Sequence, residues 1–529
     1  MNVLEGNAYA NGLSSYDITM HSGSMLRGTG TNTGTVTISD GATFALGNSV
    51  GTITVGTLVL SSGSTTLIEM DATAASSIVV TGSATIAGAL QVVPDIAPYA
   101  HQGSYLILSA GSMSGSFSSI SSSPGFTFDL NYLADEIYLD YLLAIPTENL
   151  KGNARKVANY LNENAPPSIG FTELAMLSGD TLKEALNSVS PARNGFGTYI
   201  AAQTAFSLSN VLSTHLDSSR FVGKKSSEDH MTAMLTADSS DTIVAKQEEK
   251  KNRFSTWITG FGEFAHQAAL DQNPSFNFIS EAVLAGFDYQ AGDKDLIGVS
   301  LGYAHTRYNE NDHAGHGNIN YYFASVYGNG FIGDFYLSPA IWGMFNQTSN
   351  TRDISFPGFS DKAHANIFAW QLIPHLEAGY DIAFSWGDVV PFTAADWAIS
   401  WQRGYSEHGA SPFNAEQKRK NSSMVRSETG IKVSEKWDYK WGSFSLREKA
   451  SYVFEKPYGT GTVNTSFVGA PTTFTVSSVD QNLNLGAVGI DFAFAVGKSK
   501  PVTIELGYAG EFGVNYWSND VMLNVNKSF

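Results

Sequence analysis

Two groups of residues have types and spacings that could support chemistry. Residues 47–51 read Gly-Asn-Ser-Val-Gly and match the pattern G-x-S-x-G, in which a serine on a sharp strand-to-helix turn acts as a nucleophile. That chemistry also needs a histidine and an acid nearby. Here the motif stands in a stretch rich in Gly, Ser and Thr, where chance matches are expected. We therefore predict no catalytic role for Ser49.

The second group is a pair of imidazoles, His313 and His316, whose spacing would let both reach one metal ion. A zinc site takes three or four protein ligands, and the sequence offers no further ligand at a recognisable spacing. The chain has 0 Cys, which removes thiolate ligands, thiol nucleophiles and disulfides. The sequence therefore predicts a protein that is not an enzyme, with no cofactor and no resident metal.

Composition excludes several classes of protein. Of the 529 residues, 49 are acidic and 31 are basic, giving a formal charge of −18 that argues against a nucleic-acid binder. The 43% hydrophobic content is too high for a disordered chain. No apolar run reaches the ~18 residues of a transmembrane helix. The first residues also lack a basic stretch followed by an apolar one, so no secretory signal is expected.

The first zone, residues 1–145, is rich in Gly, Ser, Thr and β-branched residues. Short alternating segments such as 35–38, 52–55 and 77–80 recur between glycines, which favours the rungs of a β-solenoid. A β-sandwich is the alternative on this pattern. Heavier strands are expected at 104–108, 126–130 and 136–142, where their aromatic residues would cap the last rung.

The second zone, residues 146–252, changes to a helical period and forms a predicted helical linker. Prolines at 166–167 and 191 end the first two helices. A third helix is expected over 197–220, rich in small residues and only weakly amphipathic, and it is the first candidate for a pore helix. Residues 223–252 are polar and charged and are expected to be a mobile linker, with 230–250 as a second candidate helix.

The third zone, residues 253–529, alternates large apolar residues with small or polar ones. In 297–304, for example, Ile297, Val299 and Leu301 alternate with glycine and serine. A soluble β-protein would turn the large residues inward, whereas a membrane barrel turns them toward lipid. Small residues on the other face are expected to leave room for a helix; the ones considered are Gly298, Gly302, Gly507 and Ala509.

Connector lengths favour the membrane barrel. We predict 12 antiparallel strands, with very short connectors alternating with long polar ones at 265–280, 307–317, 349–364, 404–421 and 455–479. Outer-membrane barrels sort their connectors in this way, with short turns on one side and long loops on the other. Aromatic residues near strand ends are expected to form girdles at the membrane surfaces. These are Trp257, Tyr289, Trp386, Trp401, Trp437, Tyr439, Trp441 and Trp517.

Four stretches of this zone resemble the translocator domain of monomeric autotransporters, the type V secretion proteins of Gram-negative bacteria. They are residues 257–262, 285–303, 376–380 and the chain end 524–529. Residues 152–158 are similar to the helical segment that often precedes such barrels, and residues 82–143 to the end of a solenoid passenger. The fold class implied is mainly β, with a 12-stranded transmembrane β-barrel after an N-terminal β-solenoid and a short α-helical linker.

The resemblance also implies a function and partners. The barrel would insert in the outer membrane and export or display its own N-terminal passenger for adhesion or interaction. Implied partners are outer-membrane lipid, the barrel-assembly machinery, periplasmic chaperones and a host or cell-surface ligand, with the protein itself a monomer. The residues that resemble the signal for barrel assembly are Val521, Leu523, Val525 and Phe529.

Two alternative functions stay open at this stage. One is a solute-conducting porin, and the other is a carrier for a passenger enzyme whose catalytic part is missing. Asp491 and Glu505, on the expected lumen face, are predicted to pair with basic groups of the threaded helix. The sequence does not decide between the two candidate plug helices.

Overall fold

The computed structural model describes residues 1–47, 49–121, 123–222, 253–270, 273–292, 294–311, 314–497 and 501–529. Asn48, His313, and the predicted linker 223–252 with its candidate helix 230–250 lie outside these described residues. The chain divides into two compact units. The N-terminal unit comprises Met1–Val189, Ser355–Ser360 and Ala470–Thr472, and the C-terminal unit comprises Ser190–Ile354, Asp361–Gly469 and Thr473–Phe529.

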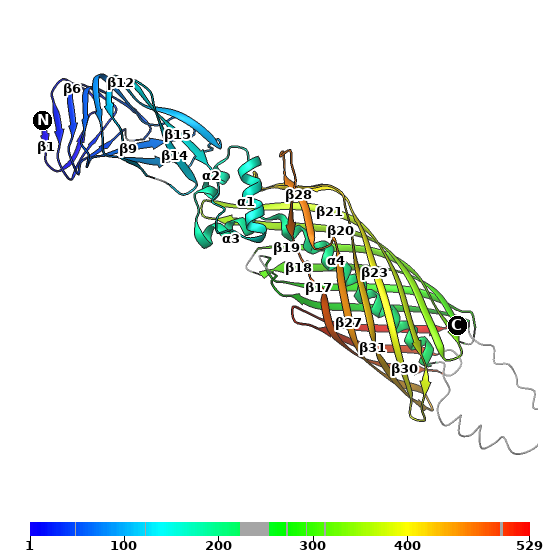
Figure 1. Cartoon of the computed structure of the whole chain (residues 1–529). Helices are drawn as coiled ribbons and strands as arrows, with labels where there is room; N and C mark the ends of the chain where they lie inside the picture. The colour runs from blue at the N-terminus through cyan, green and yellow to red at the C-terminus, as the bar shows by residue number, and fades with distance from the viewer. Residues whose placement is uncertain are drawn as a thin grey trace, which may run out of the picture. The chain divides into compact units, whose positions relative to one another are not determined.

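The N-terminal unit begins with two parallel β-sheets, drawn in blue and cyan in Figure 1. Successive strands from β4 to β13 alternate between the sheets, so that β4, β6, β8, β10 and β12 pair in one sheet and β5, β7, β9, β11 and β13 in the other. The strands are β1 Asn2–Val3, β2 Gly6–Tyr9, β3 Leu13–Ser14, β4 Ile18–Met20, β5 Ser24–Arg27, β6 Thr31–Ile38, β7 Thr43–Ala45, β8 Thr52–Leu60, β9 Thr65–Met70, β10 Ser77–Ile86, β11 Ala89–Pro94, β12 Gln102–Gly115 and β13 Ser119–Ile120.

An apolar ladder holds the first sheet together. The register places Ile18, Val36, Leu58 and Ala84 beside one another on four successive strands of that sheet. All four side chains are buried, while their neighbours in sequence alternate to the other face. Each strand therefore covers the apolar residue of the strand before it, and the stabilisation comes from burial between strands.

The last strands of the unit change direction. β15 Glu136–Leu143 pairs antiparallel with both β12 and β14 Phe126–Tyr132. Aromatic rings gather under these strands, with Tyr99 in edge-to-face contact with Phe126 and Tyr141. The hydroxyl of Tyr99 donates to the backbone oxygen of Met70 at 2.7 Å, so the buried ring has a partner for its polar group.

Three helices follow in the same unit: α1 Gly152–Asn164, α2 Ile169–Ala175 and α3 Gly179–Val189. The prolines at 166–167 separate α1 from α2, and Ser168 caps α2 by accepting a hydrogen bond from the backbone N–H of Phe171. Leu182, Leu186 and Val189 form the buried face of α3 at helical spacing.

The C-terminal unit is a closed antiparallel barrel (Figure 1). Twelve long strands pair in chain order, and the ring closes where β16 pairs with β32. The predicted 12-stranded barrel is therefore confirmed. Its strands are β16 Phe254–Gln267, β17 Phe276–Gln290, β18 Leu296–Glu310, β19 Gly315–Ile332, β20 Phe335–Phe356, β21 Phe359–Tyr380, β23 Asp388–Gln402, β26 Lys420–Tyr439, β27 Gly442–Tyr458, β30 Leu483–Val496, β31 Val502–Phe512 and β32 Tyr516–Ser528, with the two-residue β22 Ile382–Ala383 beside β23.

The two faces of the barrel differ in the predicted sense. Val299 and Leu301 are 50% and 68% exposed on the outside, whereas Ser300 between them is buried and its Oγ lies 2.6 Å from the Oγ of Ser325. Exposed Ile, Val, Leu and aromatic residues recur on the outer face of the other strands. The outer surface is thus apolar, as contact with lipid requires.

The predicted connectors need correction. The expected long loop at 349–364 is wrong, because β20 continues to Phe356 and β21 starts at Phe359, and the loop at 307–317 shrinks to four residues between β18 and β19. Both segments carry many polar residues, which sequence patterns assign to loops. In the barrel they satisfy their backbone groups by extending the ladder.

Two long connectors keep their length but are also folded. The segments 403–419 and 459–482 contain β24 Tyr405–Ser406, β25 Ala415–Gln417, β28 Thr462–Phe467 and β29 Phe474–Ser477. These four strands pair in the order β24-β25-β28-β29 to form a small sheet. The end of the barrel that carries this sheet is called the long-connector end below, and the opposite end, where β16 begins and β32 stops, the short-turn end.

Among the described residues, no helix combines the length and the apolar character that crossing a membrane requires.

The faces of β18 generate a test. Val299→Arg places a charge on the apolar outer face and should cost ~2–4 kcal/mol of barrel stability at mid-membrane depth. Val299→Leu at the same site should be close to neutral, because it keeps an apolar side chain there. Urea unfolding in lipid vesicles measures both. Equal stability of the two variants would show that this face does not contact lipid.

Candidate functional site

The lumen of the barrel contains the helix α4 Phe196–Val222, preceded by the short helix η1 Pro191–Gly195 (Figure 1). Nearly every residue from Phe196 to Arg220 is buried, on all sides of the helix. A helix that carries apolar residues all round, without one dominant apolar face, is a buried helix, and burial on all sides requires an enclosing wall. Small residues such as Ala201, Ala205 and Ser209 keep the helix narrow enough for the lumen.

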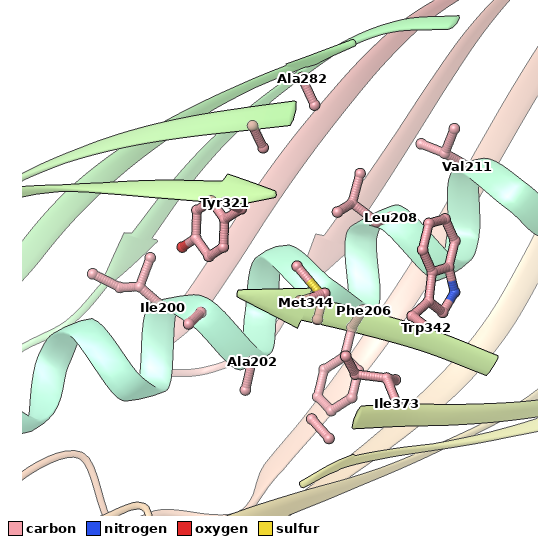
Figure 2. Close-up of a cluster of buried hydrophobic side chains, with 14 of the residues drawn as sticks. Ile200, Ala202, Phe206, Leu208, Val211, Ala282, Tyr321, Trp342, Met344 and Ile373 are labelled. Atoms are coloured by element: carbon pink, nitrogen blue, oxygen red, sulfur yellow. The ribbon is translucent and has the colours of Figure 1, made fainter. Parts of the chain in front are cut away.

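One side of α4 faces an apolar part of the wall, which Figure 2 shows. Ile200, Phe206 and Leu208 belong to one buried cluster with wall residues from most strands of the barrel, β16 to β21 among them. The wall residues labelled there are Ala282, Tyr321, Trp342, Met344 and Ile373. Burial of these side chains against the helix holds it in the lumen, at ~25 cal/mol per Å² of apolar surface removed from water.

The role predicted for two glycines is wrong. A Cβ on Gly298 would lie 2.3 Å from the ring of Tyr327, and one on Gly302 would lie 2.5 Å from the ring of Phe323. These glycines therefore make room for aromatic rings of the neighbouring strand, and those rings lie nearest to them. Gly507 and Ala509 do line open space beside α4, although a Cβ on Gly507 would also overlap the side chains of Asp491 and Met522. Sequence alternation shows which face a glycine is on, but it cannot show which ring lies over it.

Trp257 also differs from its predicted place in a girdle. It is buried, and its Nε1 donates to the hydroxyl of Tyr327 at 2.7 Å. The residue lies on the inward register of β16, beside His215 of α4 at a ring-centroid distance of 4.4 Å. Other predicted girdle residues, including Trp386, Trp437 and Trp517, are exposed on the barrel.

A buried polar network holds the start of α4 at the long-connector end. Asn194 of η1 donates to Oε1 of Glu407 at 2.8 Å and accepts from Nδ2 of Asn350 at 2.7 Å. Arg352 donates to Oε2 of Glu407 at 2.6 Å, and both side chains are fully buried. Glu407 also accepts from the backbone N–H of Ala415 at 2.6 Å, so the folded connector 403–419 is tied to β20 and to η1.

Arg193 adds a second attachment at the same end. Its Nη1 donates to the backbone oxygen of Ala314 at 2.5 Å, and its Nε lies 3.5 Å from Oε2 of Glu310. Both residues belong to the β18–β19 side of the barrel end. The chain is thus fixed on two sides at the point where it enters the lumen.

Neutral side chains of α4 face carboxylates of the wall at mid-lumen. Gln203 donates to Oε2 of Glu455 at 2.8 Å, and Ser207 donates to Oε1 of Glu263 at 3.0 Å. Thr204 lies close to the same carboxylate, 3.4 Å from Oε2. The helix therefore binds this part of the wall through hydrogen bonds to carboxyl groups, without adding a charge of its own.

Two histidines connect the C-terminal half of α4 to the wall. His215 of α4 lies 3.1 Å from Oδ2 of Asp288. Ser213 lies 3.4 Å from Nε2 of His375, whose Nδ1 is 2.8 Å from Oδ1 of Asp396. The order Ser-His-Asp is that of a nucleophilic triad, but Ser213 is part of the helix that fills the lumen. We therefore assign Ser213, His375 and Asp396 a structural role, which is to hold α4 against the wall.

Charged groups secure the last turn of α4 at the short-turn end. Asp217 lies 2.8 Å from Nζ of Lys432, which is also 2.6 Å from Oε1 of Glu377. Arg220 pairs with Asp217 within the helix, and its guanidinium lies 3.8 Å above the ring of Tyr336. The helix is therefore held along its whole length, from η1 to the short-turn end.

The wall pairs most of its charges within itself. Arg426 lies within 3.3 Å of carboxylate oxygens of Glu428, Glu455 and Glu511. Lys449 is 2.9 Å from Oε1 of Glu428.

The two lumen carboxylates singled out in the sequence are also paired within the wall. Asp491 and Glu505 both pair with Arg447 of β27, so the prediction that they meet basic groups of the helix is wrong. Sequence alternation places these carboxylates on the lumen face. It cannot indicate that the neighbouring strand supplies the guanidinium.

A cavity remains on the polar side of the helix. The cavity has a volume of about 50 Å³ and lies between α4 and strands of the β21–β32 part of the wall. Ser207, Asn210 and Asp217 of α4 face it, opposite small residues Gly489 and Ala509. The residues that line this cavity are mostly polar, and α4 does not fill the lumen on this side.

The chain end lies in the closing strand. Val521 and Leu523 are exposed on the outer face of β32, opposite Gly262 and Gly260 of β16. Val525 is half-buried opposite Ile258. Phe529 is exposed, and its backbone N–H donates to the oxygen of Phe254 at 2.9 Å. The four residues of the predicted assembly signal are thus next to the seam of the barrel, and their recognition role stays a prediction.

The other candidate residues are placed apart from the lumen. Ser49 lies in a bend between β7 and β8, a strand-to-strand connection unlike the strand-to-helix turn of a nucleophile elbow. His316 is exposed on β19. Within the described ranges, no three His, Cys, Asp or Glu residues are arranged to hold a metal ion.

A closed antiparallel barrel with an apolar outer face and a helix in its lumen defines an outer-membrane β-barrel with an occupied pore. Residues 256–509 match the model of the autotransporter β-domain, and this part of the chain belongs to that family. Membership places the barrel in the outer membrane, where such barrels are inserted by the assembly machinery. A search of curated proteins found no match.

Solved structures similar to this chain include three translocator units. The translocator domain of NalP from Neisseria meningitidis is 11% identical, covering 62% of this chain and 98% of its own, with a TM-score of 0.42. The β-domain of Brka from Bordetella is 14% identical over 52% and 100% of the two chains, with a TM-score of 0.38. The transport unit of AIDA-I from Escherichia coli is 15% identical over 58% and 98%, with a TM-score of 0.34.

The occupied lumen predicts the conductance of the barrel. In planar bilayers the full chain should pass little current, because α4 fills the pore on its apolar side. Deleting residues 197–220 should raise the single-channel conductance several-fold. Glu281→Gln, which changes an exposed residue on the outer face, is the control and should leave the conductance low. Equal conductance with and without the helix would place it outside the pore.

Proposed function

We propose that the protein exports its own N-terminal residues 1–145 through the outer membrane and displays them at the cell surface, for adhesion or another interaction. The observation that carries this proposal is the path of the chain. It enters the barrel at the long-connector end, runs through the lumen once as α4, and ends at the short-turn end, where β16 begins. A polypeptide held in this way connects the two sides of the membrane.

We infer that the two parallel sheets are the faces of a β-solenoid passenger. The alternation of successive strands between the sheets supports this inference, because each pair of strands then makes one rung. Each rung stacks on its neighbour through apolar residues in register, as Val36 of β6 does on Leu58 of β8. Rungs that fold outside the cell cannot slip back through the pore, so folding would bias transport outward.

In this proposal the protein is a transporter and display scaffold without enzymatic activity. Its partners would be outer-membrane lipid, the barrel-assembly machinery, periplasmic chaperones and a host or cell-surface ligand, and it would act as a monomer. A solute-conducting porin is disfavoured by the contacts that fix α4 in the lumen. A passenger enzyme has no supporting observation in the residues considered above.

Surface display is directly testable. The protein should fractionate with the outer membrane, and a tag inserted after residue 11, before β3, should react with antibody on intact cells. A tag in the short turn between β26 and β27, at residues 440–441, should react only after the cells are broken. Reaction of the second tag on intact cells would invert the proposed orientation. Protection of both tags on intact cells would argue against display.

The chain end gives a second test. Deleting Phe529 should slow barrel assembly in cells, measured as the time to reach the heat-modifiable folded form, because the assembly signal loses its terminal ring. The finished barrel should keep its stability, since one exposed ring contributes little to it. Val514→Ala, an exposed residue in the turn before β32, is the control. Unchanged assembly kinetics without Phe529 would refute the recognition role.

A further inference from the structure

Two histidines stand side by side at the long-connector end of the barrel. His364 belongs to β21, and His408 belongs to the folded connector 403–419. Their backbones exchange two hydrogen bonds, because the N–H of His364 donates to the oxygen of His408 at 2.9 Å and the N–H of His408 donates to the oxygen of His364 at 3.1 Å. Residues paired in this way turn their side chains to the same face. Both side chains are exposed, so the two imidazoles share one solvent-accessible face.

The distance between the two imidazoles fits a shared metal ion. Their ring centroids are 5.8 Å apart, with an angle of 42° between the ring planes. With metal–nitrogen distances of ~2.0–2.1 Å, two imidazoles on one ion have centroids ~4.5 Å apart when the ligands are at right angles and ~6.4 Å apart when they are opposite. The observed separation lies within these limits, so small rotations of the rings can bring one nitrogen of each onto the same ion.

A hydroxyl group orients the ring of His364. Its Nδ1 lies 3.0 Å from Oγ1 of Thr351 in β20. When the proton of the neutral ring is on Nδ1, it donates to this hydroxyl and leaves the lone pair on Nε2. Metal-binding histidines usually have a hydrogen-bond partner on the other ring nitrogen, which fixes both the tautomer and the orientation of the ring. Thr351 is itself buried, so the barrel holds this partner in place.

The ring of His408 is carried by a fixed backbone. Glu407, the preceding residue, is buried and accepts a hydrogen bond from Nη2 of Arg352 at 2.6 Å. Gly409, the following residue, lies so close to β21 that a Cβ there would be 2.4 Å from the backbone oxygen of Lys362. Its φ of +104° is also one that favours glycine. The connector is thus held against β21 on both sides of His408, which positions the imidazole before any ion binds.

The donor set selects late transition metals. Imidazole nitrogens suit Zn²⁺, Cu²⁺ and Ni²⁺, whereas Mg²⁺ and Ca²⁺ prefer oxygen ligands. The ammonium group of Lys362, two residues before His364, would repel a cation, but it lies 3.2 Å from a carboxylate oxygen of Asp353 and is paired with it. Within the described ranges, no group of three His, Cys, Asp or Glu residues is arranged to hold a metal ion. Water therefore has to fill the remaining coordination positions, which leaves the ion exchangeable.

We propose that His364 and His408 bind a divalent late transition-metal ion at the outer face of the long-connector end, with Cu²⁺ bound most tightly. The general order of affinities places Cu²⁺ above both Ni²⁺ and Zn²⁺. The bound ion joins the connector 403–419 to β21. It is an exchangeable ion taken from the surroundings, in contrast to a resident metal. The inference concerns the barrel alone and does not depend on the export proposed above.

The test uses Cu²⁺ as the probe, because its electron paramagnetic resonance spectrum reports nitrogen ligands. The full chain without an affinity tag, folded in detergent and mixed with one equivalent of CuCl₂, should give a signal split by two imidazole nitrogens. His364→Gln and His408→Gln should each weaken Cu²⁺ binding by more than about tenfold, and Thr351→Val, which keeps both ligands, by about tenfold. Both histidines are exposed, so the variants should keep the heat-modifiable folded form, which gel mobility checks.

Two other histidines of the barrel serve as controls. His266→Gln is the matched one, because the ring of His266 stacks on Trp517 and its Nδ1 lies 2.8 Å from Oδ1 of Asn277. This variant should bind Cu²⁺ as the wild-type chain does. His316→Gln should also leave binding unchanged. Loss of binding in His316→Gln, with binding kept in His364→Gln, would assign the ion to His316 and overturn the proposal.

The position of the ion can be measured directly. Crystals of the full chain soaked in ZnCl₂ should show an anomalous peak between the two rings, at ~2.0–2.1 Å from one nitrogen of each. His408→Gln should abolish this peak, and His266→Gln should keep it. The proposal is refuted if the peak contacts only one of the two imidazoles. It is also refuted if the Cu²⁺ signal is the same in His364→Gln, His408→Gln and the wild-type chain.

Discussion

The pairing of β16 with β32 is the interaction on which the C-terminal unit depends. Thirteen residue pairs, from Ser255 with Ser528 to Gln267 with Tyr516, join the first strand of the barrel to the last. Without this seam both strands would expose a row of unpaired N–H and C=O groups, which lipid cannot satisfy. The predicted assembly residues lie in or directly after β32, so the strand that closes the barrel also carries most of the predicted assembly signal.

Closure creates an interior that must be filled, and the chain fills it asymmetrically. On one side α4 packs against a cluster of apolar residues that includes Phe206, Trp342 and Met344. On the other side it faces carboxyl groups through Gln203 and Ser207 and leaves a cavity lined mostly by polar residues. The helix suits both environments, because its large apolar residues such as Phe206 pack against the wall while small residues such as Ser207 leave space on the polar side.

Sequence patterns predicted the barrel but not the details of its lumen. Alternation at Val299 and Ser300 fixed the two faces, since a strand has period 2 whatever surrounds it. The same patterns misplaced Trp257 and the partners of Asp491, because these depend on which strand lies alongside. The network of Asn194, Arg352 and Glu407 was not predicted at all. Its members are separated by up to 213 residues, and each reads alone as an ordinary polar residue.

The distribution of charge in the lumen has a consequence for transport. Arg352, Arg426 and Arg447 each pair with carboxylates of the wall or of its connectors. One ion pair between α4 and the wall joins Asp217 to Lys432. The wall therefore does not rely on α4 for most of its charge compensation. Under the proposed function this matters, because residues 1–145 must traverse the same lumen before α4 occupies it. A wall whose charged side chains are already paired with one another can hold its shape while segments of different sequence pass through the lumen. The neutral side chains of α4 then form their hydrogen bonds to the wall last.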